Sequence, residues 1–303
     1  MHKLTLAMIV KNEAPNILEC LESVAPYICS YVIADTGSTD NTKELIKTFF
    51  DSKNIPGEIL DHPWEDFGTN RSKVLAHCQG KTKWALMIDA DDYIKGTLPS
   101  VDTFDDTLDG YVVKIVREPM VWYRAQIFNL AKKPWRYEEP LHEYACCETP
   151  MDVQKLEGDY SWHVRTQGCR SRSSSSDREK YIKDYFLLKT YLDKDPNQPR
   201  KQFYAAQSAF DSQLYEVAEK EYLKRAHMDS WPEEIFYSWM RVGICRAIQG
   251  KPLEEIADAF LKSYESRPNR AEPLYQLSCT YRQFQRPKAA FLMAVQGLGM
   301  SPD

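Results

Sequence analysis

Short apolar runs alternate with amphipathic segments along the first 90 residues of the chain. Residues 4–10, 31–34, 58–60 and 84–88 are the predicted strands, and all of them except Glu58-Ile59-Leu60 are apolar runs. Each of the first three is followed by a stretch whose apolar positions recur at helical spacing. Strands that alternate with helices predict a mostly parallel sheet with right-handed crossovers and helices on both faces. The pattern therefore predicts an α/β domain.

Polar side chains follow three of these predicted strands. Lys11-Asn12-Glu13 follows the first strand, Asp35 ends the second, and Asp89-Ala90-Asp91-Asp92 follows the fourth. In an open α/β sheet, ligands bind outside the carboxyl ends of the strands, and hard oxygen ligands there suit Mg²⁺ or Mn²⁺ with a phosphorylated substrate. An isolated acidic turn is also a common way to end a strand, so the motif alone does not decide between these two interpretations.

Four segments, taken in order, resemble the signature of family 2 glycosyltransferases of the GT-A fold. They are residues 8–13, residues 35–42, the pair Asn70-Arg71, and residues 89–92. The resemblance implies a Rossmann-like nucleotide-sugar domain. It also implies a metal-dependent inverting transfer of a sugar, with glucose a candidate, from a UDP-sugar donor to an acceptor.

The same resemblance implies a role for individual positions. Asp35 would accept a hydrogen bond from the uracil, and Arg71 would approach the uracil or the phosphates. Asp89 would face the ribose or the metal, and Asp91 would bind Mn²⁺ or Mg²⁺. The implied donor-binding positions are Val10, Asn12, Glu13, Asp35, Arg71, Asp89 and Ala90.

Two further strands are predicted at residues 111–116 and 125–130, and they would extend the sheet with antiparallel members to form the acceptor half of the site. Residues 134–143 then resemble a W-x-x-x-x-x-x-H-E segment of the family branch with a helical C-terminal domain, although members often carry a glycine where this chain has Glu138-Glu139. An inverting transfer needs a carboxylate base. Glu143 is the first candidate and Glu138 or Glu139 the next. The alternative is an acid paired with a nearby arginine.

His163 and the stretch after it are the next candidates. A lone histidine is more often a structural hydrogen-bonding group, but the resemblance places one here as the second protein ligand of the metal. Residues 168–176 are small and polar and include Arg170 and Arg172. They are either a flexible linker or a lid that brings positive charge to the diphosphate.

From Asp177 onward, helical periodicity dominates, and helix pairs recur with a period in the thirties. This part resembles tetratricopeptide repeats, in which each pair of helices buries its apolar face on the next. The expected organisation is a catalytic domain at residues 1–170, a connector or lid at 171–178 and a tetratricopeptide-like domain at 179–303. The helical domain would bind the acceptor, mediate a homodimer or support the catalytic domain.

Composition limits which partners and which cellular location we expect for the protein. The net charge of −5 argues against a nucleic-acid partner, which would normally meet a broad basic face. The eight cysteines form no C-x-x-C pair, which favours reduced thiols, and no apolar run approaches the length of a membrane span. We therefore expect a cytoplasmic protein.

Two other functions compete with that of a glycosyltransferase. A nucleotidyltransferase would normally carry a glycine-rich basic loop near its N-terminus, and Lys11-Asn12-Glu13 is neither glycine-rich nor strongly basic. A catalytically silent scaffold that binds a protein through its helices would have no need of the acids at 89–92 or of His163. The acceptor itself stays open between a glycan, a protein and a small molecule.

Overall fold

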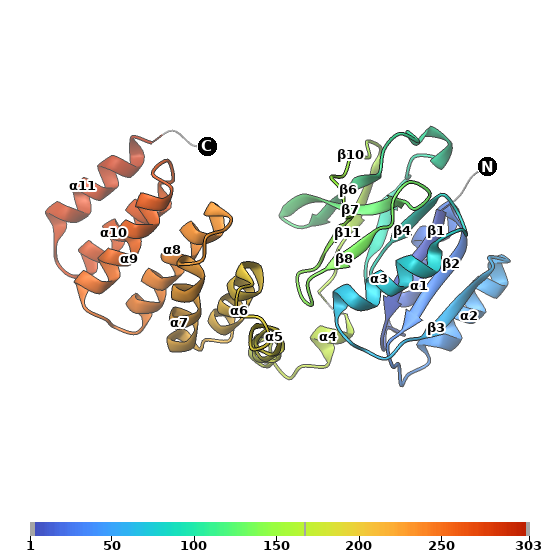
Figure 1. The fold of residues 1–303 in the computed structure, drawn as a ribbon, viewed down its shortest axis with the longest axis horizontal. Coiled ribbons are helices and arrows are strands. Elements are labelled where there is room, and N and C mark those ends of the chain that lie inside the picture. The colour runs from blue at the N-terminus through green and yellow to red at the C-terminus, as the bar shows by residue number, and fades with distance from the viewer. Residues whose placement is uncertain (1–3, 167, 301–303) are drawn as a thin grey trace. The chain divides into compact units, whose positions relative to one another are not determined.

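The computed structural model describes residues 4–166 and 168–300, and the chain divides into two units, Met1–Ser173 and Ser174–Asp303 (Figure 1). In the part of the chain that the structure describes, no helix is both long enough and apolar enough to cross a membrane. Each unit is described by itself below.

A nine-stranded mixed sheet forms the centre of the first unit, with the order β3-β2-β1-β4-β7-β6-β11-β5 and β10 paired to β6. Strands β1 to β4 pair in parallel, whereas β7 runs antiparallel to both β4 and β6. The mostly parallel sheet and its antiparallel extension are thereby confirmed. The strands are β1 (Leu4–Val10), β2 (Ile28–Asp35), β3 (Gly57–Asp61), β4 (Trp84–Met87), β5 (Tyr93–Gly96), β6 (Gly110–Arg117), β7 (Met120–Asn129), β10 (Val153–Lys155) and β11 (Tyr160–His163).

Helices cover both faces of this sheet because the strand side chains alternate in direction. Leu6 and Met8 of β1 pack with helices α1 (Ile17–Val24) and α2 (Thr42–Lys53) in one apolar cluster. Ala7 packs with α3 (Phe67–Cys78) in the cluster on the opposite face. Strands β1 and β4 are therefore buried on both faces, which explains why they are continuous apolar runs in the sequence.

Shorter elements complete the first unit. Two 3₁₀ turns lie at Ala25–Tyr27 and Val101–Thr103, and a separate hairpin consists of β8 (Arg136–Glu138) and β9 (Tyr144–Cys146). The short helix α4 (Cys169–Arg172) lies near the end of the unit.

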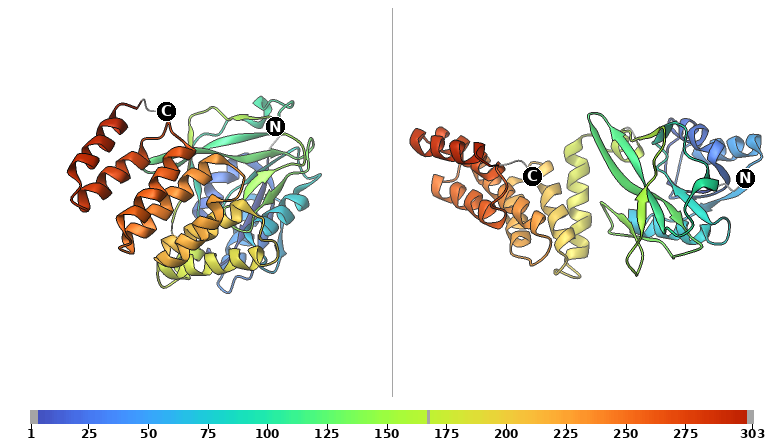
Figure 2. Two further views of the ribbon diagram at one scale, coloured as in Figure 1. Left: turned by 60° about the vertical axis from the view of Figure 1, so that its left-hand side comes forward. Right: turned by 90° about the horizontal axis from the view of Figure 1, so that it is seen from above.

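The second unit is entirely helical in its described part, and each helix packs against the next (Figures 1 and 2). Three pairs, α6–α7, α8–α9 and α10–α11, correspond to the expected tetratricopeptide-like pairs, and α5 precedes them. The helices are α5 (Asp177–Leu192), α6 (Pro199–Asp211), α7 (Tyr215–Ala226), α8 (Pro232–Ile248), α9 (Leu253–Ser266), α10 (Glu272–Gln283) and α11 (Pro287–Leu298).

Candidate active site

The loops after β1 and β2 lie together at the carboxyl edge of the sheet. Val10 and Asp35 are Cα partners at the ends of the two strands. Beyond them, the Asn12 N–H donates to Ser38 Oγ at 2.9 Å, and Asn12 Oδ1 accepts from the Thr39 N–H at 2.7 Å. Asn12 has a φ of 51°, a left-handed conformation that asparagine tolerates better than most residues. The hydrogen bonds of Asn12 hold one loop against the other.

Asp35 is 2% exposed and has one oxygen in use and one available. Its Oδ1 accepts from the N–H groups of Gly37 at 2.9 Å and Ser38 at 2.8 Å, in a turn that the φ of 105° at Gly37 makes possible. Its Oδ2 is buried and has no hydrogen-bond partner among the described residues. A buried carboxylate oxygen without a donor is costly, so this atom is suited to accept a hydrogen bond from a ligand.

Glu13 connects the loop after β1 to the end of the first unit. Its Oε2 accepts from Asn16 Nδ2 at 2.8 Å and from Arg172 Nη2 at 3.0 Å, while its Oε1 accepts from the Cys169 N–H. Arg172 Nη2 also donates to the Asn12 carbonyl at 2.5 Å. Residues 169–172 therefore lie directly on the loop that follows β1.

The acids of the turn at 89–92 have different surroundings. Asp89 Oδ1 accepts from Arg71 Nη2 at 2.5 Å. Burial acts against the charge on Asp89, but Arg71 and Arg124 outweigh it and hold the pKa of Asp89 below its usual value. Asp92 is 2% exposed and accepts from Trp162 Nε1 at 3.1 Å. The hydrogen bond to Asp92 thus holds β11 against the turn and gives Asp92 a structural contact.

The surroundings of Asp91 are dominated by negative charge. Burial, Asp89 and Glu13 together raise the pKa of Asp91 to about 7. A Cβ atom at position 168 would collide with Asp91 Oδ2 and would lie 3.2 Å from Glu13 Oε1, so a larger residue there would require the Asp91 side chain to move. Carboxylate oxygens are hard ligands of the kind that Mg²⁺ and Mn²⁺ accept, so Asp91 stays a candidate ligand of such an ion.

Arg71 joins two of the predicted site residues. It is 6% exposed, and besides its bond to Asp89 its Nε donates to Glu143 Oε1 at 2.9 Å. Its guanidinium lies 5.7 Å from the ring centroid of Tyr137. Arg124 of β7 is a second cation here, with Nη2 3.9 Å from Asp89 Oδ2. Sequence reasoning missed Arg124, because its approach to Asp89 depends on the antiparallel pairing of β4 and β7.

The segment that carries Glu143 is fastened to α3. The Tyr137 N–H donates to Ser72 Oγ at 2.8 Å, and the Phe67 N–H donates to the Pro140 carbonyl at 3.3 Å. Glu139 has a φ of 76°, which is a left-handed conformation that favours glycine. In the family pattern that this segment resembles, a glycine often lies at the position of Glu138 or Glu139. The departure from the family pattern therefore places a strained residue four positions before Glu143.

Glu138 is engaged elsewhere. Its carboxylate accepts from Arg136 Nη2 at 2.7 Å and from the Tyr144 hydroxyl at 2.8 Å. Hydrogen bonds from Tyr144 and Arg136 lower the pKa of Glu138. These contacts tie Glu138 to the β8–β9 hairpin, whereas Glu143 is tied through Arg71 to Asp89.

His163 lies at the end of β11. Its Nε2 lies 2.8 Å from Ser161 Oγ, and its ring stacks on Tyr93 with centroids 5.1 Å apart. Burial and the nearby Lys95 lower its pKa. Its neighbour Trp162 contacts Asp92, so alternation along the strand directs His163 to the other face of the sheet. Across residues 4–166 and 168–300, no three His, Cys, Asp or Glu residues are grouped to hold a metal, and the ligand role of His163 stays a prediction.

Comparison with known proteins assigns the family. A model described as Glycosyl transferase family 2 matches residues 5–176, which is more than half of the chain. The chain belongs to glycosyl transferase family 2. The predicted family is thereby confirmed, and the mixed sheet of the first unit is the GT-A domain that the four segments implied.

Several relatives of this glycosyltransferase cover part of its length. The SPbeta prophage-derived glycosyltransferase SunS of Bacillus subtilis is 27% identical over 136 residues, which are 44% of this chain and 31% of the relative. The lipopolysaccharide core biosynthesis glycosyltransferase LpsC of Rhizobium meliloti is 28% identical over 38% of this chain and 42% of its own length. The chain thus spans less than half of the length of these curated relatives.

Solved structures show a distant likeness. S. aureus TarS in complex with UDP-GlcNAc aligns over 99% of this chain and 93% of that chain, with 16% identity and a TM-score of 0.43. MamA aligns over 46% of this chain and 77% of that chain, with 15% identity and a TM-score of 0.36.

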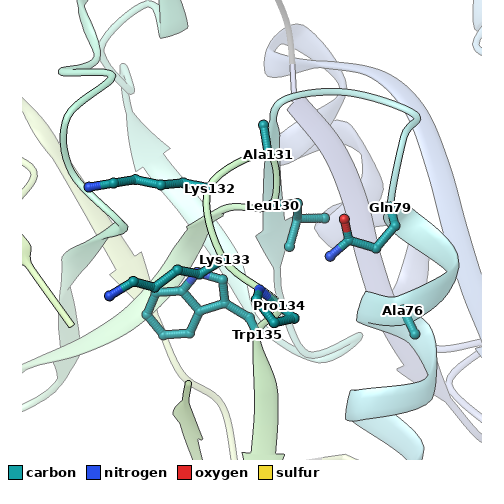
Figure 3. Close-up of a pocket in the computed structure, with 8 residues that line it drawn as sticks. All are labelled: Ala76, Gln79, Leu130, Ala131, Lys132, Lys133, Pro134 and Trp135. Atoms are coloured by element: carbon teal, nitrogen blue, oxygen red, sulfur yellow. The ribbon is translucent and has the colours of Figure 1, made fainter. Parts of the chain in front are cut away.

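A pocket of about 350 Å³ lies at the opposite edge of the glycosyltransferase sheet from the acidic turn. The N–H of Leu130, which lines the pocket, donates to the carbonyl of Lys83, the residue that precedes β4. Asp89 lies beyond the other end of β4. Figure 3 shows Lys132 and Lys133 beside Trp135. Both lysines pair with Asp109, and Trp135 is 4% exposed and donates to the Asp109 carbonyl. Trp135 is therefore a packed core residue.

Proposed function

We propose that this glycosyltransferase transfers a sugar, such as glucose, from a UDP-sugar to a nucleophilic acceptor with inversion at the anomeric carbon. The observation that carries the proposal is the free Oδ2 of Asp35, which is buried at the carboxyl end of β2 without a partner among the described residues. A uracil presents an N–H donor that such an oxygen accepts. A buried charge-assisted hydrogen bond of this type selects strongly for the base that supplies the donor.

Asp91 is the proposed first ligand of Mn²⁺ or Mg²⁺. Its carboxylate stands beside the carboxylates of Glu13 and Asp89, and Asp89 is already occupied by Arg71. When bound, the ion would neutralise the charge on the leaving diphosphate. His163, the proposed second ligand, would have to turn away from Ser161 to take part. Arg172, already bonded to Glu13, adds positive charge at the same edge.

Glu143 is the proposed general base. In the inverting step, its carboxylate takes the proton of the acceptor hydroxyl as the acceptor oxygen bonds to the anomeric carbon and the bond from that carbon to the diphosphate breaks. Arg71 fixes the position of Glu143 through the 2.9 Å bond from Nε. Both carboxylate oxygens of Glu138 are engaged, Oε1 by Arg136 and Oε2 by Tyr144, whereas the bond from Arg71 uses Oε1 of Glu143, so Glu138 is the weaker candidate.

The test is the release of UDP from a panel of UDP-sugars with Mn²⁺, for the wild type and two variants. Asp35→Asn places an N–H₂ donor or a neutral oxygen toward the uracil, so we expect the KM for the donor to rise. Asp61→Asn is the matched control, because Asp61 is the Cα partner of Asp35 at the end of β3 but is exposed and paired with Lys43. The absence of UDP release with every UDP-sugar, or equal KM values for both variants, would contradict the proposal. Screening glycans, peptides and small molecules would then identify the acceptor.

A further inference from the structure

Arg124 lies beside the acidic turn without a hydrogen bond to it. It is part of β7, which pairs with β4, the strand that Asp89 follows (Figure 1). The Nη2 atom of Arg124 lies 3.9 Å from Asp89 Oδ2, which is beyond the length of a hydrogen bond. The Nε atom of Arg124 is buried and has no hydrogen-bond partner among the described residues. The guanidinium therefore lies next to a carboxylate without being bonded to it.

Arg71 shows how this site holds an arginine that positions carboxylates. Its Nε and Nη2 both donate, to Glu143 and Asp89, and 7% of its side chain is exposed. Arg124 differs in both respects. Its Nε has no partner in the part of the chain that the structure describes, and 38% of its side chain is exposed, together with 28% of the Asp89 side chain. Arg124 and Asp89 are therefore both within reach of a ligand.

A β-bulge decides the face of the sheet on which Arg124 lies. Ala125 and Ile127 pair with consecutive residues of β6, although one residue separates them in β7. In a regular strand they would point to the same face, but Ile127 packs in one apolar cluster of the first unit and Ala125 packs against the other. Bulges re-aim side chains and often lie next to active sites. Arg124 directly precedes this bulge.

The gap between Arg124 and Asp89 has the length and the charges that suit one hydroxyl group. An oxygen about 2.8 Å from Nη2 and from Oδ2 spans their separation of 3.9 Å. A hydroxyl accepts from Nη2 and donates to Oδ2, so it satisfies both groups at once. A carboxylate or phosphate would also accept from Arg124, but Asp89 would repel it. The pair therefore favours a neutral ligand that carries hydroxyl groups.

We propose that Arg124 and Asp89 bind a hydroxyl group of the transferred sugar, which makes Arg124 a specificity-determining residue. This inference rests on the proposed function, in which Asp91 binds the ion at the diphosphate and Glu143 takes the acceptor proton. The sugar ring then lies between Asp91 and Glu143. Asp89 precedes Asp91 by two residues, and Arg71 joins Asp89 to Glu143. The second carboxylate oxygen of Asp89 and the guanidinium of Arg124 therefore lie beside that ring.

The test removes each partner of the proposed bond in turn. The wild type and Arg124→Met are titrated, with Mn²⁺ present, with UDP, with the UDP-sugar that releases UDP fastest, and with the monodeoxy analogues of that sugar. The wild type should bind one analogue roughly 10- to 100-fold more weakly than the parent sugar, because a hydrogen bond to charged groups is lost. Arg124→Met should lose most of this discrimination. Isothermal titration calorimetry measures each Kd.

Arg117→Met is the matched control, because Arg117 is an exposed arginine of β6 in the same hairpin. It should keep the sugar preference of the wild type. Both variants should bind UDP as tightly as the wild type, which also shows that they are folded. The inference is overturned if Arg124→Met keeps every preference of the wild type. It is also overturned if Arg124→Met loses affinity for UDP as much as for the UDP-sugar, since Arg124 would then contact the ribose or the phosphates.

Failure of the inference and failure of the proposed function are distinguishable in these titrations. A wild type that binds neither UDP nor any UDP-sugar would contradict the proposed function and this inference with it. A wild type that binds the UDP-sugar, together with an Arg124→Met variant of unchanged sugar preference, would contradict the role of Arg124 alone.

Discussion

The repeat unit and the glycosyltransferase unit each contain a buried arginine that is paired with carboxylate. The charges balance in the repeat unit, whereas negative charge is in excess in the glycosyltransferase unit. In the repeat unit, Arg225 is fully buried, and its Nε and Nη2 donate to Glu234 Oε2 at 3.1 and 2.9 Å. Its Nη1 donates to the Met228 carbonyl at 3.2 Å. One cation pairs with one anion, and other N–H groups of Arg225 donate to backbone carbonyls. This arrangement is a structural ion pair.

In the glycosyltransferase unit, Arg71 meets two carboxylates, and more stand beside them. Asp89 and Glu143 share Arg71, while Asp91 experiences the negative charge of Asp89 and Glu13. Crowding of unbalanced like charges costs stability and is typical of functional sites. A buried ion pair by itself therefore does not indicate a functional site, whereas the surplus of negative charge around Asp91 is the feature from which we predict one.

Removing Arg225, whose charge is balanced by Glu234, should have the largest effect on stability. Arg225→Ala leaves Glu234 buried without a cation, which should lower the free energy of unfolding of the repeat unit by about 3–5 kcal/mol. Urea denaturation followed by circular dichroism measures this change. Lys183→Ala, which breaks an exposed pair with Glu179 on α5, is the control and should change little. Equal effects of the two substitutions would show that the buried pair is not structural.

Removing the carboxylate of Asp91 should lower the activity and leave the stability intact. Asp91→Asn should slow UDP release by roughly 100- to 1,000-fold, because the proposed ion loses its first ligand. The melting temperature should hold or rise, since the variant relieves repulsion with Asp89 and Glu13. Rates and thermal melts on the same preparation measure both quantities. A variant that melts early and keeps its rate would make Asp91 a structural residue like Arg225.

Arg71 tests whether a shared arginine positions both of its carboxylates. Lysine keeps the charge but offers a single ammonium group in place of a fork, so Arg71→Lys cannot bond Asp89 and Glu143 as Arg71 does. We expect kcat to fall by roughly 10- to 100-fold, as for other residues that orient a site. Steady-state kinetics separates kcat from KM. A change in KM alone would indicate that Arg71 binds the donor and does not orient Glu143.

The smallest effect concerns backbone strain, which both units contain. Glu139 in the first unit and Gln213 in the second have φ values of 76° and 64°. Glu139→Gly and Gln213→Gly should each raise stability by about 0.5–1 kcal/mol, because relief of strain exceeds the entropic cost of glycine. Thermal denaturation measures this gain. Only Glu139→Gly should alter UDP release, because Glu139 lies on the turn that leads to Glu143. Equal rates of UDP release for both variants would show that the conformation of Glu139 does not affect catalysis.

Local pattern predicts most of this fold, and distant pairing limits prediction of the site. Strand β1 coincides with the apolar run at residues 4–10, because a strand buried on both faces is apolar throughout. The contact of Arg71 with Glu143 joins residues 72 positions apart, and its contact with Asp89 joins residues 18 apart. A single sequence shows that these residues are polar but not which of them meet. For the same reason, the structural role of Asp92 emerges only when Trp162 is placed beside it.

The same limit applies to the helical unit. Its helix pairs follow from periodicity, since each helix carries apolar residues at the spacing that faces its neighbour. The exposure of Phe291, Leu292 and Val295 on α11 does not follow, because it depends on which helices lie beside α11 in space. Periodicity predicts the helix, and packing decides which of its sides remain open.

The most direct test of the charge surplus at Asp91 is the binding of Mn²⁺ in the presence of UDP, followed by the loss of the electron paramagnetic resonance signal of free Mn²⁺. The wild type and the Asp61→Asn control should bind the ion with equal affinity, and Asp91→Asn should bind it roughly tenfold or more weakly. If Asp91→Asn bound Mn²⁺ as tightly as the control, the carboxylate of Asp91 would not be a ligand of the ion, and the charge surplus would not mark a cation site.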